Sequence, residues 1–156
     1  MSASRSFREA LGRYPTGVAL ITLMAEGRPM AMTVNSFASV SLDPPLILWS
    51  VDRAGKRYRL FRDTLHFAVN VLAADQEALS VFCAQNDDLG LSDAAWSPGQ
   101  DGAPLVKGCV ARFECSREAV HAGGDHDIII GRVDAFDMPR TAPALVFHRS
   151  AYAQAG

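Results

Sequence analysis

Short apolar runs separated by turn-forming residues recur along most of the chain, and this pattern limits the fold more than any other feature. The runs occupy residues 18–25, 30–34, 46–51, 67–72, 108–118, 128–136 and 144–147. Most are too short for a helix, and several are rich in β-branched side chains. The turn residues 26–29 (EGRP) between the first two runs predict a hairpin. Six or seven mostly antiparallel strands of this kind predict a mainly β fold in which the sheet closes into a barrel.

Two other segments have helical patterns. Residues 6–9 (SFRE) match a capping box, so we expect a short helix that starts at Ser6 and ends before Pro15. Asp75 is the expected N-cap of a second helix that runs to Gln85. The stretch that follows, up to Gly102, is rich in Asp, Gly, Ser and Pro and predicts a long surface loop. With 156 residues and neither a repeat nor a linker, we expect a single domain over residues 1–156.

Composition and charge exclude several classes of partner. Hydrophobic residues make up 49% of the chain and charged residues 21%, as in an ordinary globular protein. The formal net charge of −2 gives no electrostatic reason to expect nucleic acid as a partner. No apolar run is long enough to span a bilayer, so we expect no membrane partner. The first residues contain no apolar core typical of a signal peptide, and a cytoplasmic location is the expectation.

The three cysteines, Cys83, Cys109 and Cys115, form no C-x-x-C pair, and their odd number argues against a disulfide framework. Alternation places Cys109 and Cys115 on the same face of the predicted strand 108–118 as Phe113. We therefore expect them to be small buried apolar residues, not redox or metal-binding groups.

Residues 32–45 (MTVNSFASVSLDPP) are unusually dense in small hydroxyl and amide side chains for a segment that begins as an apolar strand. The sequence Asp43-Pro44-Pro45 then forces an extended turn, because proline fixes φ and restricts the residue before it. A strand end rich in neutral hydrogen-bonding groups suits a planar ligand with many heteroatoms, such as a flavin ring. The alternative is that these side chains bond to their own backbone in turns.

Five segments together resemble the short-chain flavin reductases, which are reductase components of two-component flavin monooxygenases. They are residues 7–18, 32–45, 67–72, 124–133 and 145–149, in the order that the family uses. The resemblance implies an FMN-binding split β-barrel with a Greek-key, mostly antiparallel sheet and a few peripheral helices. It also implies a homodimer and a separate monooxygenase that receives the reduced flavin.

The activity implied by this resemblance is hydride transfer from NADH or NADPH to FMN or FAD. In such an enzyme the cofactors carry the chemistry, and the protein supplies orientation and electrostatics. No G-x-G-x-x-G motif follows a strand, so the pyridine nucleotide is expected in a groove beside the flavin and not in a Rossmann site. The sequence does not separate FMN from FAD, NADH from NADPH, or a tightly bound flavin from an exchanging one.

Arg53, Lys56 and Arg57 form the densest basic cluster of the chain, directly after a predicted strand. Arg and Lys supply the charge-assisted donors that phosphate recognition needs. The family places a phosphate-contacting loop in this region, usually with a serine or threonine among its contacts, whereas this chain has Ala54 and Gly55. The alternative for each basic residue is a solvated surface charge.

The residues expected to contact the cofactor belong to four segments: the polar cluster, the strand after it, the basic loop and the middle strand. They are Thr33, Val34, Asn35, Ser36, Ser39, Val40, Ser41, Ser50, Asp52, Arg53, Lys56, Arg57 and Asn70. Asn70 is a lone polar residue in an apolar strand. It either completes the flavin pocket or bridges backbone groups where strands diverge, and the structural role is favoured.

His126 is the expected catalytic residue, because the family's Gly-Asp-His motif, here ending in His126, lies beside nicotinamide and flavin. An imidazole there can bind, orient or supply a proton. Many family members have an uncharged residue next, whereas this chain has Asp127, which strand alternation directs away from the histidine. Consecutive strand residues cannot all face one ion, so we expect no metal at residues 125–127.

Two other functions remain open from the sequence. A non-catalytic split-barrel protein could hold FMN, haem or another planar cofactor. A pyridoxamine-phosphate oxidase would share the barrel but requires a denser basic phosphate site than this chain provides. The Gly-Asp-His motif favours the reductase over the non-catalytic barrel.

Overall fold

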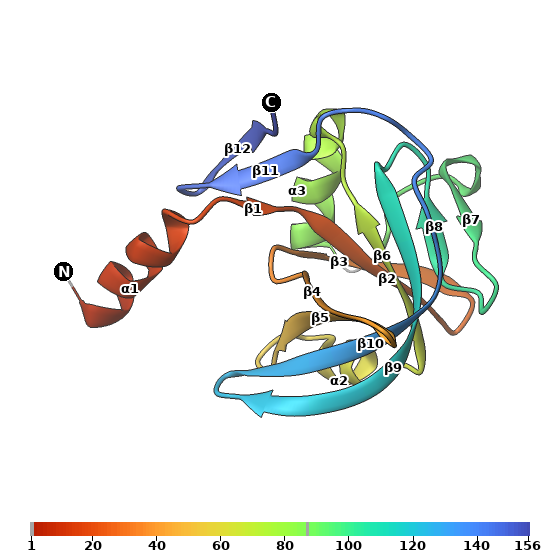
Figure 1. Cartoon of the computed structure of the whole chain (residues 1–156), viewed down its shortest axis with the longest axis horizontal. Helices are drawn as coiled ribbons and strands as arrows, with labels where there is room; N and C mark the ends of the chain where they lie inside the picture. Colours follow the sequence, from red (N-terminus) through yellow and green to blue (C-terminus); the bar gives the residue numbers. More distant parts are fainter. Residues whose placement is uncertain (1, 87) are drawn as a thin grey trace.

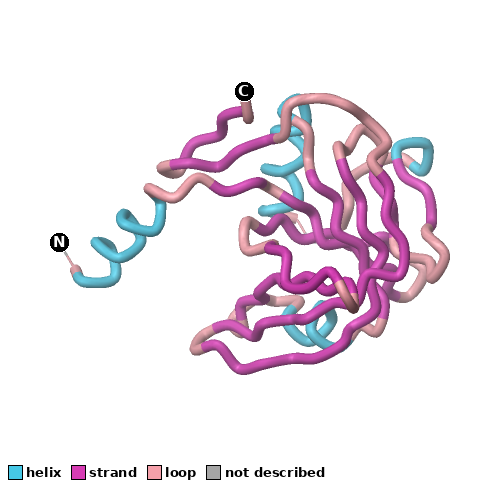
Figure 2. The backbone as a smooth tube through the Cα atoms, viewed as in Figure 1, coloured by secondary structure: helices cyan, strands magenta, loops and turns pink. Residues whose placement is uncertain are grey.

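The structure, a computed structural model, describes residues 2–86 and 88–156. Across these residues the main sheet pairs its strands antiparallel in the order β3-β2-β6-β9-β10-β5-β4. The strands are β2 (Ala19–Ala25), β3 (Arg28–Val34), β4 (Ala38–Leu42), β5 (Pro45–Asp52), β6 (His66–Val71), β9 (Ala111–Gly123) and β10 (His126–Asp137). Figures 1 and 2 show that this sheet is strongly curved.

The curvature follows from how the two edges of the sheet are connected. Edge strands β3 and β4 are joined by residues 35–37 alone. Such a link spans at most about 14 Å when fully extended, so both edges must lie close together. The sheet therefore bends back on itself, and the predicted mainly β, antiparallel split barrel is confirmed.

Large apolar side chains fill the barrel interior. Trp49 and Phe67 are fully buried there with ring centroids 6.0 Å apart, and Ile21 and Ile129 pack in the same cluster. Gly131 makes this packing possible, because a Cβ at that position would lie 2.7 Å from the Phe67 ring. Alternation along β2 sends every second residue inward, as expected for a strand with one face in a core.

The other face of β2 is also buried. Leu20 packs there with Leu72, Cys83, Leu89 and Val106. This outer core is covered by helix α3 (Glu77–Gln85) and by strands β7 (Trp96–Pro98) and β8 (Pro104–Val106). A short 3₁₀ turn, Ala74–Gln76, precedes α3, and another, Asp93–Ala95, precedes β7.

The remaining elements lie at the periphery. Helix α1 (Ala3–Gly12) projects away from the barrel. Next to the barrel end of α1 lies a small sheet of β1 (Thr16–Gly17), β11 (Leu145–His148) and β12 (Ala151–Gln154). Helix α2 (Tyr58–Asp63) packs against β5 through the buried Phe61. No helix within the described residues is long and apolar enough to cross a membrane.

The structure corrects four predictions about local elements. Helix α1 begins at Ala3, because Ser2 and not Ser6 caps it, with Ser2 Oγ accepting from the Arg5 N–H at 3.3 Å. Asp75 lies in the 3₁₀ turn before α3 and is not its N-cap. The predicted loop 86–102 contains a 3₁₀ turn and β7. The turn predicted at residues 43–45 is present but is shorter: Asp43 and Pro44 form the two-residue loop of the β4–β5 hairpin, and Pro45 already belongs to β5.

The expected burial of the three cysteines is confirmed, but the strand face that Cys109 and Cys115 were expected to share is not. All three are described, buried and free of disulfides. Burial raises the pKa of each thiol to about 12, so none is ionised at neutral pH. Cys115 belongs to the barrel interior, but Cys109 precedes β9 and belongs to the outer core, so the two do not share a strand face.

Candidate functional site

A groove follows the outer side of edge strand β3. Its basic end is a cavity of about 190 Å³ lined by Met32, Lys56, Arg57 and Ala84, among others. A second cavity of about 190 Å³ adjoins it through Ala84 and is lined by Thr33, Val34, Asn35, Phe147 and Tyr152. Asn35 and Phe147 also line a third, wider hollow that reaches Tyr14 and Thr16. We call this continuous surface the β3 groove.

The middle of the β3 groove has a neutral and aromatic lining. Asn35 is exposed directly after β3, so its amide is available to a ligand on this surface. Phe147 and Tyr152 come from the paired strands β11 and β12. Their ring centroids lie 5.3 Å apart in an edge-to-face contact. The Thr33 hydroxyl donates to the Ser80 carbonyl of α3 at 2.7 Å, which fixes that helix along the groove.

The predicted serines and Val40 lie outside the lining of this groove. Ser36 Oγ accepts from the Ser50 N–H at 2.9 Å, so these two residues join the β3–β4 connection to β5. Ser39, Val40 and Ser41 form part of edge strand β4, where Ser39 pairs with Ile47 and a bulge follows. The described cavities of the groove have none of these five residues in their lining.

Asn70 lies in the core, away from the groove. It is fully buried, its Nδ2 donates to Leu20 O and Thr22 Oγ1, and its Oδ1 accepts from the Val106 N–H at 2.9 Å. These bonds join β6 to β2 and β8. This placement supports the structural role that the sequence analysis favoured for Asn70.

The basic loop after β5 is built around its own backbone. Asp52 Oδ1 accepts from the Ala54 N–H at 2.8 Å, and the Asp52 carbonyl accepts from the Gly55 N–H at 3.1 Å. The loop closes where the Tyr58 N–H donates to the Gly55 carbonyl at 3.1 Å. The turn places exposed Lys56 on the groove, and half-buried Arg57 lines the same cavity. Asp52 therefore shapes the loop that presents Lys56.

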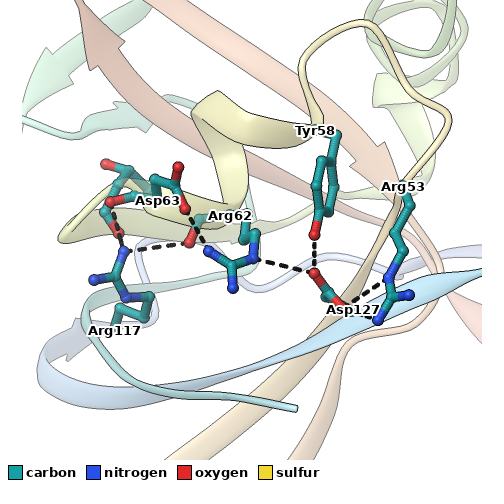
Figure 3. A network of polar contacts seen from close by, with 7 residues as sticks. Arg53, Tyr58, Arg62, Asp63, Arg117 and Asp127 are labelled. Atoms are coloured by element: carbon teal, nitrogen blue, oxygen red, sulfur yellow. Dashed lines mark hydrogen bonds and ion pairs between the residues drawn. The ribbon is translucent and has the colours of Figure 1, made fainter. Parts of the chain in front are cut away.

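Arg53 points away from this cavity and toward Asp127. Its Nε and Nη2 donate to Asp127 Oδ1 at 2.9 and 2.7 Å (Figure 3). Tyr58 OH and Arg62 Nε bond to the other carboxylate oxygen, the latter at 3.1 Å. Hydrogen bonds from Tyr58 and then Arg53 hold the pKa of Asp127 below its usual range, so the carboxylate is ionised at neutral pH.

His126 opens β10 at the tip of the β9–β10 hairpin. Its Nδ1 lies 2.7 Å from Asp125 Oδ1, and this contact lowers the pKa of Asp125. The His126 side chain is 41% exposed, and within the described residues its Nε2 has no hydrogen-bond partner. The tip is attached to the basic loop, because the Arg53 N–H donates to the Asp125 carbonyl at 3.0 Å. The structure thus brings His126 beside the basic loop but not into the lining of the β3 groove.

Strand alternation between His126 and Asp127 is confirmed. His126 is half-exposed, whereas Asp127 is buried on the opposite face against α2. Asp127 therefore cannot act as the direct hydrogen-bond partner of His126. That partner is Asp125, through His126 Nδ1.

Two groove residues and two partners of Asp127 were not predicted from the sequence. Ala84 has no functional side-chain group and Tyr152 lies far from β3 in the sequence, so only the fold brings them to β3. Tyr58 and Arg62 follow the basic loop, and their spacing of four residues was the available signal that one helical face carries both.

Potential metal ligands gather elsewhere. Within residues 2–86 and 88–156, His66, Asp101 and Asp134 have ligand atoms within 4.8 Å of one another. Asp101 and Asp134 are exposed, and Asp134 already accepts a hydrogen bond from Ser116 Oγ at 2.5 Å. We assign no ligand to this group.

Comparison with known proteins gives consistent matches over most of the chain. Residues 11–156 match the sequence model described as the flavin reductase like domain. The protein named FMN reductase (NADH) SmoA from Agrobacterium fabrum is 49% identical over 130 residues, which cover 83% of this chain and 74% of that protein. The reductase component of the flavin-dependent trigonelline monooxygenase of Acinetobacter baylyi is 39% identical over 95% of this chain. The matched region spans only 48% of that relative.

A solved structure matches the fold closely. The NADH:FAD oxidoreductase SgcE6 of Streptomyces globisporus, in complex with NAD and FAD fragments, superposes with a TM-score of 0.89 at 33% identity. The match covers 99% of this chain and 93% of that chain.

Proposed function

The chain belongs to the flavin reductase like family, and on that premise we propose that residues 1–156 form one domain that reduces free flavin with NADH or NADPH. The reaction oxidises NADH to NAD⁺ and, with one proton, converts FMN to FMNH₂ or FAD to FADH₂. We further propose that the reduced flavin passes to a separate monooxygenase. Membership in this family agrees with the expectation from the five sequence segments.

The proposal depends mainly on the β3 groove, whose middle and basic end differ in chemistry. Its middle is neutral and aromatic, through Asn35, Phe147 and Tyr152, which suits a flat heteroaromatic ring. Its basic end carries Lys56, which suits a phosphate. When bound, the flavin supplies the redox chemistry by accepting the hydride of the nicotinamide. The donors in the groove fit a flavin phosphate of the FMN type.

The residues of the chain would bind the flavin and orient the nicotinamide against it. Lys56 holds the phosphate end, and Asn35 hydrogen-bonds to the polar edge of the ring. His126, with Nε2 available and Nδ1 held by Asp125, positions the nicotinamide from the adjoining hairpin. FMN and NADH are the pair to test first, because the Agrobacterium relative is named for them.

Addition of FMN to the purified protein is expected to start NADH oxidation without any monooxygenase present. The rate should rise with FMN to a plateau, because the groove holds the flavin before hydride transfer. The measurement is NADH absorbance over a range of FMN, FAD and riboflavin concentrations, repeated with NADPH. A protein that binds flavin but oxidises neither nucleotide would instead be a non-catalytic flavin-binding barrel.

We also propose a homodimer, and helix α1 supports it. Within the described part of α1 no residue is buried. Phe7 and Leu11 are 65% and 57% exposed, and Tyr14 just beyond the helix is 75% exposed. An amphipathic helix that projects from the barrel leaves this apolar face in water unless another surface covers it. A second copy of the chain is the simplest cover, in the closed symmetry that most homo-oligomers adopt.

Light scattering should therefore give a mass about twice the chain's 16.8 kDa at micromolar concentration. Phe7→Asp with Leu11→Asp is expected to yield monomers, because two carboxylates would be buried without partners. Leu65→Asp is the control, since Leu65 is 57% exposed but lies outside α1. A wild-type monomer would contradict the dimer.

The cytoplasm is the location that we propose. NADH and NADPH are intracellular metabolites, and three free thiols suit a reducing compartment.

A further inference from the structure

One buried carboxylate connects both ends of the basic loop. Asp127 is 4% exposed, and its two oxygens receive hydrogen bonds from Arg53, Tyr58 and Arg62 (Figure 3). Arg53 is the first residue of the loop after β5, and Tyr58 is the first residue of α2. Residues 54–57, which include Lys56, thus form a span whose two ends are attached to the same side chain.

The charges in this cluster balance. Asp127 pairs with Arg53 and Arg62, and Arg62 Nη1 also pairs with Asp63 at 2.7 Å. The two arginines therefore face two carboxylates. Arg117 of β9 fixes the far end of α2, because its Nη1 donates to the Asp63 carbonyl at 2.5 Å. Helix α2 is held at its start through Asp127 and at its end through Arg117, so the loop before it has little freedom to shift.

Arg53 is committed to this cluster. Its guanidinium makes two bonds to Asp127, and a group held in that way is poorly placed to turn toward the β3 groove. Among the described residues of this loop, Lys56 is the exposed charged residue that lines the groove. A charge-assisted contact from Lys56 to a phosphate depends on where the loop holds the lysine backbone.

We propose that Asp127 is a positioning residue for flavin-phosphate recognition, because it clamps both ends of the loop that presents Lys56 to the β3 groove. Arg53 then anchors the start of the loop to Asp127 and is not a ligand of the phosphate. The inference rests on the proposed function and deepens it, since it explains why this chain has a carboxylate after His126. It assigns to Asp127 an effect on the phosphate end of the ligand and none on the ring.

The test compares two ligands that differ only in the phosphate. Dissociation constants for FMN and riboflavin are measured by flavin fluorescence for wild type, Asp127→Asn and Tyr58→Phe. Asp127→Asn keeps the side-chain shape but removes the charge, and its amide presents donors to a cluster of donors. FMN binding should weaken about tenfold or more, whereas riboflavin binding should stay within about twofold. Tyr58→Phe, which removes one bond of the clamp, should give a smaller change in the same direction.

Asp137→Asn is the matched control. Asp137 lies on the same strand and also binds an arginine through two bonds, from Arg112 at 2.9 and 2.5 Å, but it does not touch the loop. Its ratio of FMN to riboflavin affinity should equal that of wild type. If Asp127→Asn does not fold, Tyr58→Phe carries the test alone.

Each result has one meaning. A loss of FMN affinity without a loss of riboflavin affinity supports the clamp. Equal losses for both ligands, or no loss for either, overturn it while the wild type still binds flavin. A wild type that binds neither FMN nor riboflavin overturns the proposed function itself.

Discussion

Replacement of His126 by alanine is expected to slow reduction of the flavin by NADH at least about tenfold, or to raise the KM for NADH by a similar factor. The imidazole stands at the hairpin tip with its Nε2 exposed, and Asp125 fixes its orientation through Nδ1. Loss of a group that aligns two reacting rings costs rate, because a displacement of about 1 Å can lower the rate about 100-fold. The affinity for oxidised FMN should change little, since His126 lies outside the lining of the β3 groove.

Single-turnover reduction under anaerobic conditions separates these effects, with FMN affinity measured independently. His121→Ala is the control, because His121 lies opposite Ile128 on the same hairpin and is exposed. An unchanged reduction rate together with an unchanged KM would leave His126 without a part in hydride transfer.

The second large effect is expected for Lys56→Ala, which should weaken FMN binding about tenfold or more. A hydrogen bond to a charged group contributes roughly 1.5–3 kcal/mol, and that range corresponds to about a tenfold change or more in affinity. Riboflavin lacks the phosphate, so its affinity should stay the same. The contact should also weaken with added salt, because Lys56 is exposed.

Lys107→Ala serves as the comparison, since Lys107 is an exposed lysine between β8 and β9, outside the groove. Equal losses of FMN and riboflavin affinity in Lys56→Ala would mean that Lys56 acts on the fold of the loop. No loss for either ligand would make the loop a solvated surface feature.

Much of the barrel could be predicted from the sequence, because burial on one face of a strand leaves a pattern. The hairpin of β2 and β3 and strands β5, β6 and β10 lie where the apolar runs indicated. Strand β4 was missed because it is an exposed edge strand whose serines and Val40 give no buried face. Helix α2 was missed because its six residues contain one buried side chain, Phe61, and no periodicity can be seen in so short a segment.

The site was harder to predict than the fold, because its key contacts join residues far apart in sequence. Composition marked Arg53 as a phosphate ligand, yet its partner Asp127 lies 74 positions away and could not be foreseen from local spacing. Asn70 was ambiguous for the same reason, since its three partners, Leu20 and Thr22 of β2 and Val106 of β8, lie 36 to 50 positions away. Polar residues were thus recognised as candidates, but only the fold decides which of them face the groove and which hold the structure.

Reduction of FMN by NADH on this protein is tested by anaerobic rapid mixing of the protein and FMN with NADH, while the flavin absorbance is followed. We expect the oxidised flavin band to disappear as an equal amount of NADH is consumed, and the protein to speed this reaction far beyond the rate of FMN and NADH alone. The reduced flavin should then leave the protein on gel filtration, as required of a donor to a separate monooxygenase. Bound flavin that stays oxidised in the presence of excess NADH and of excess NADPH would show that the protein is not a flavin reductase.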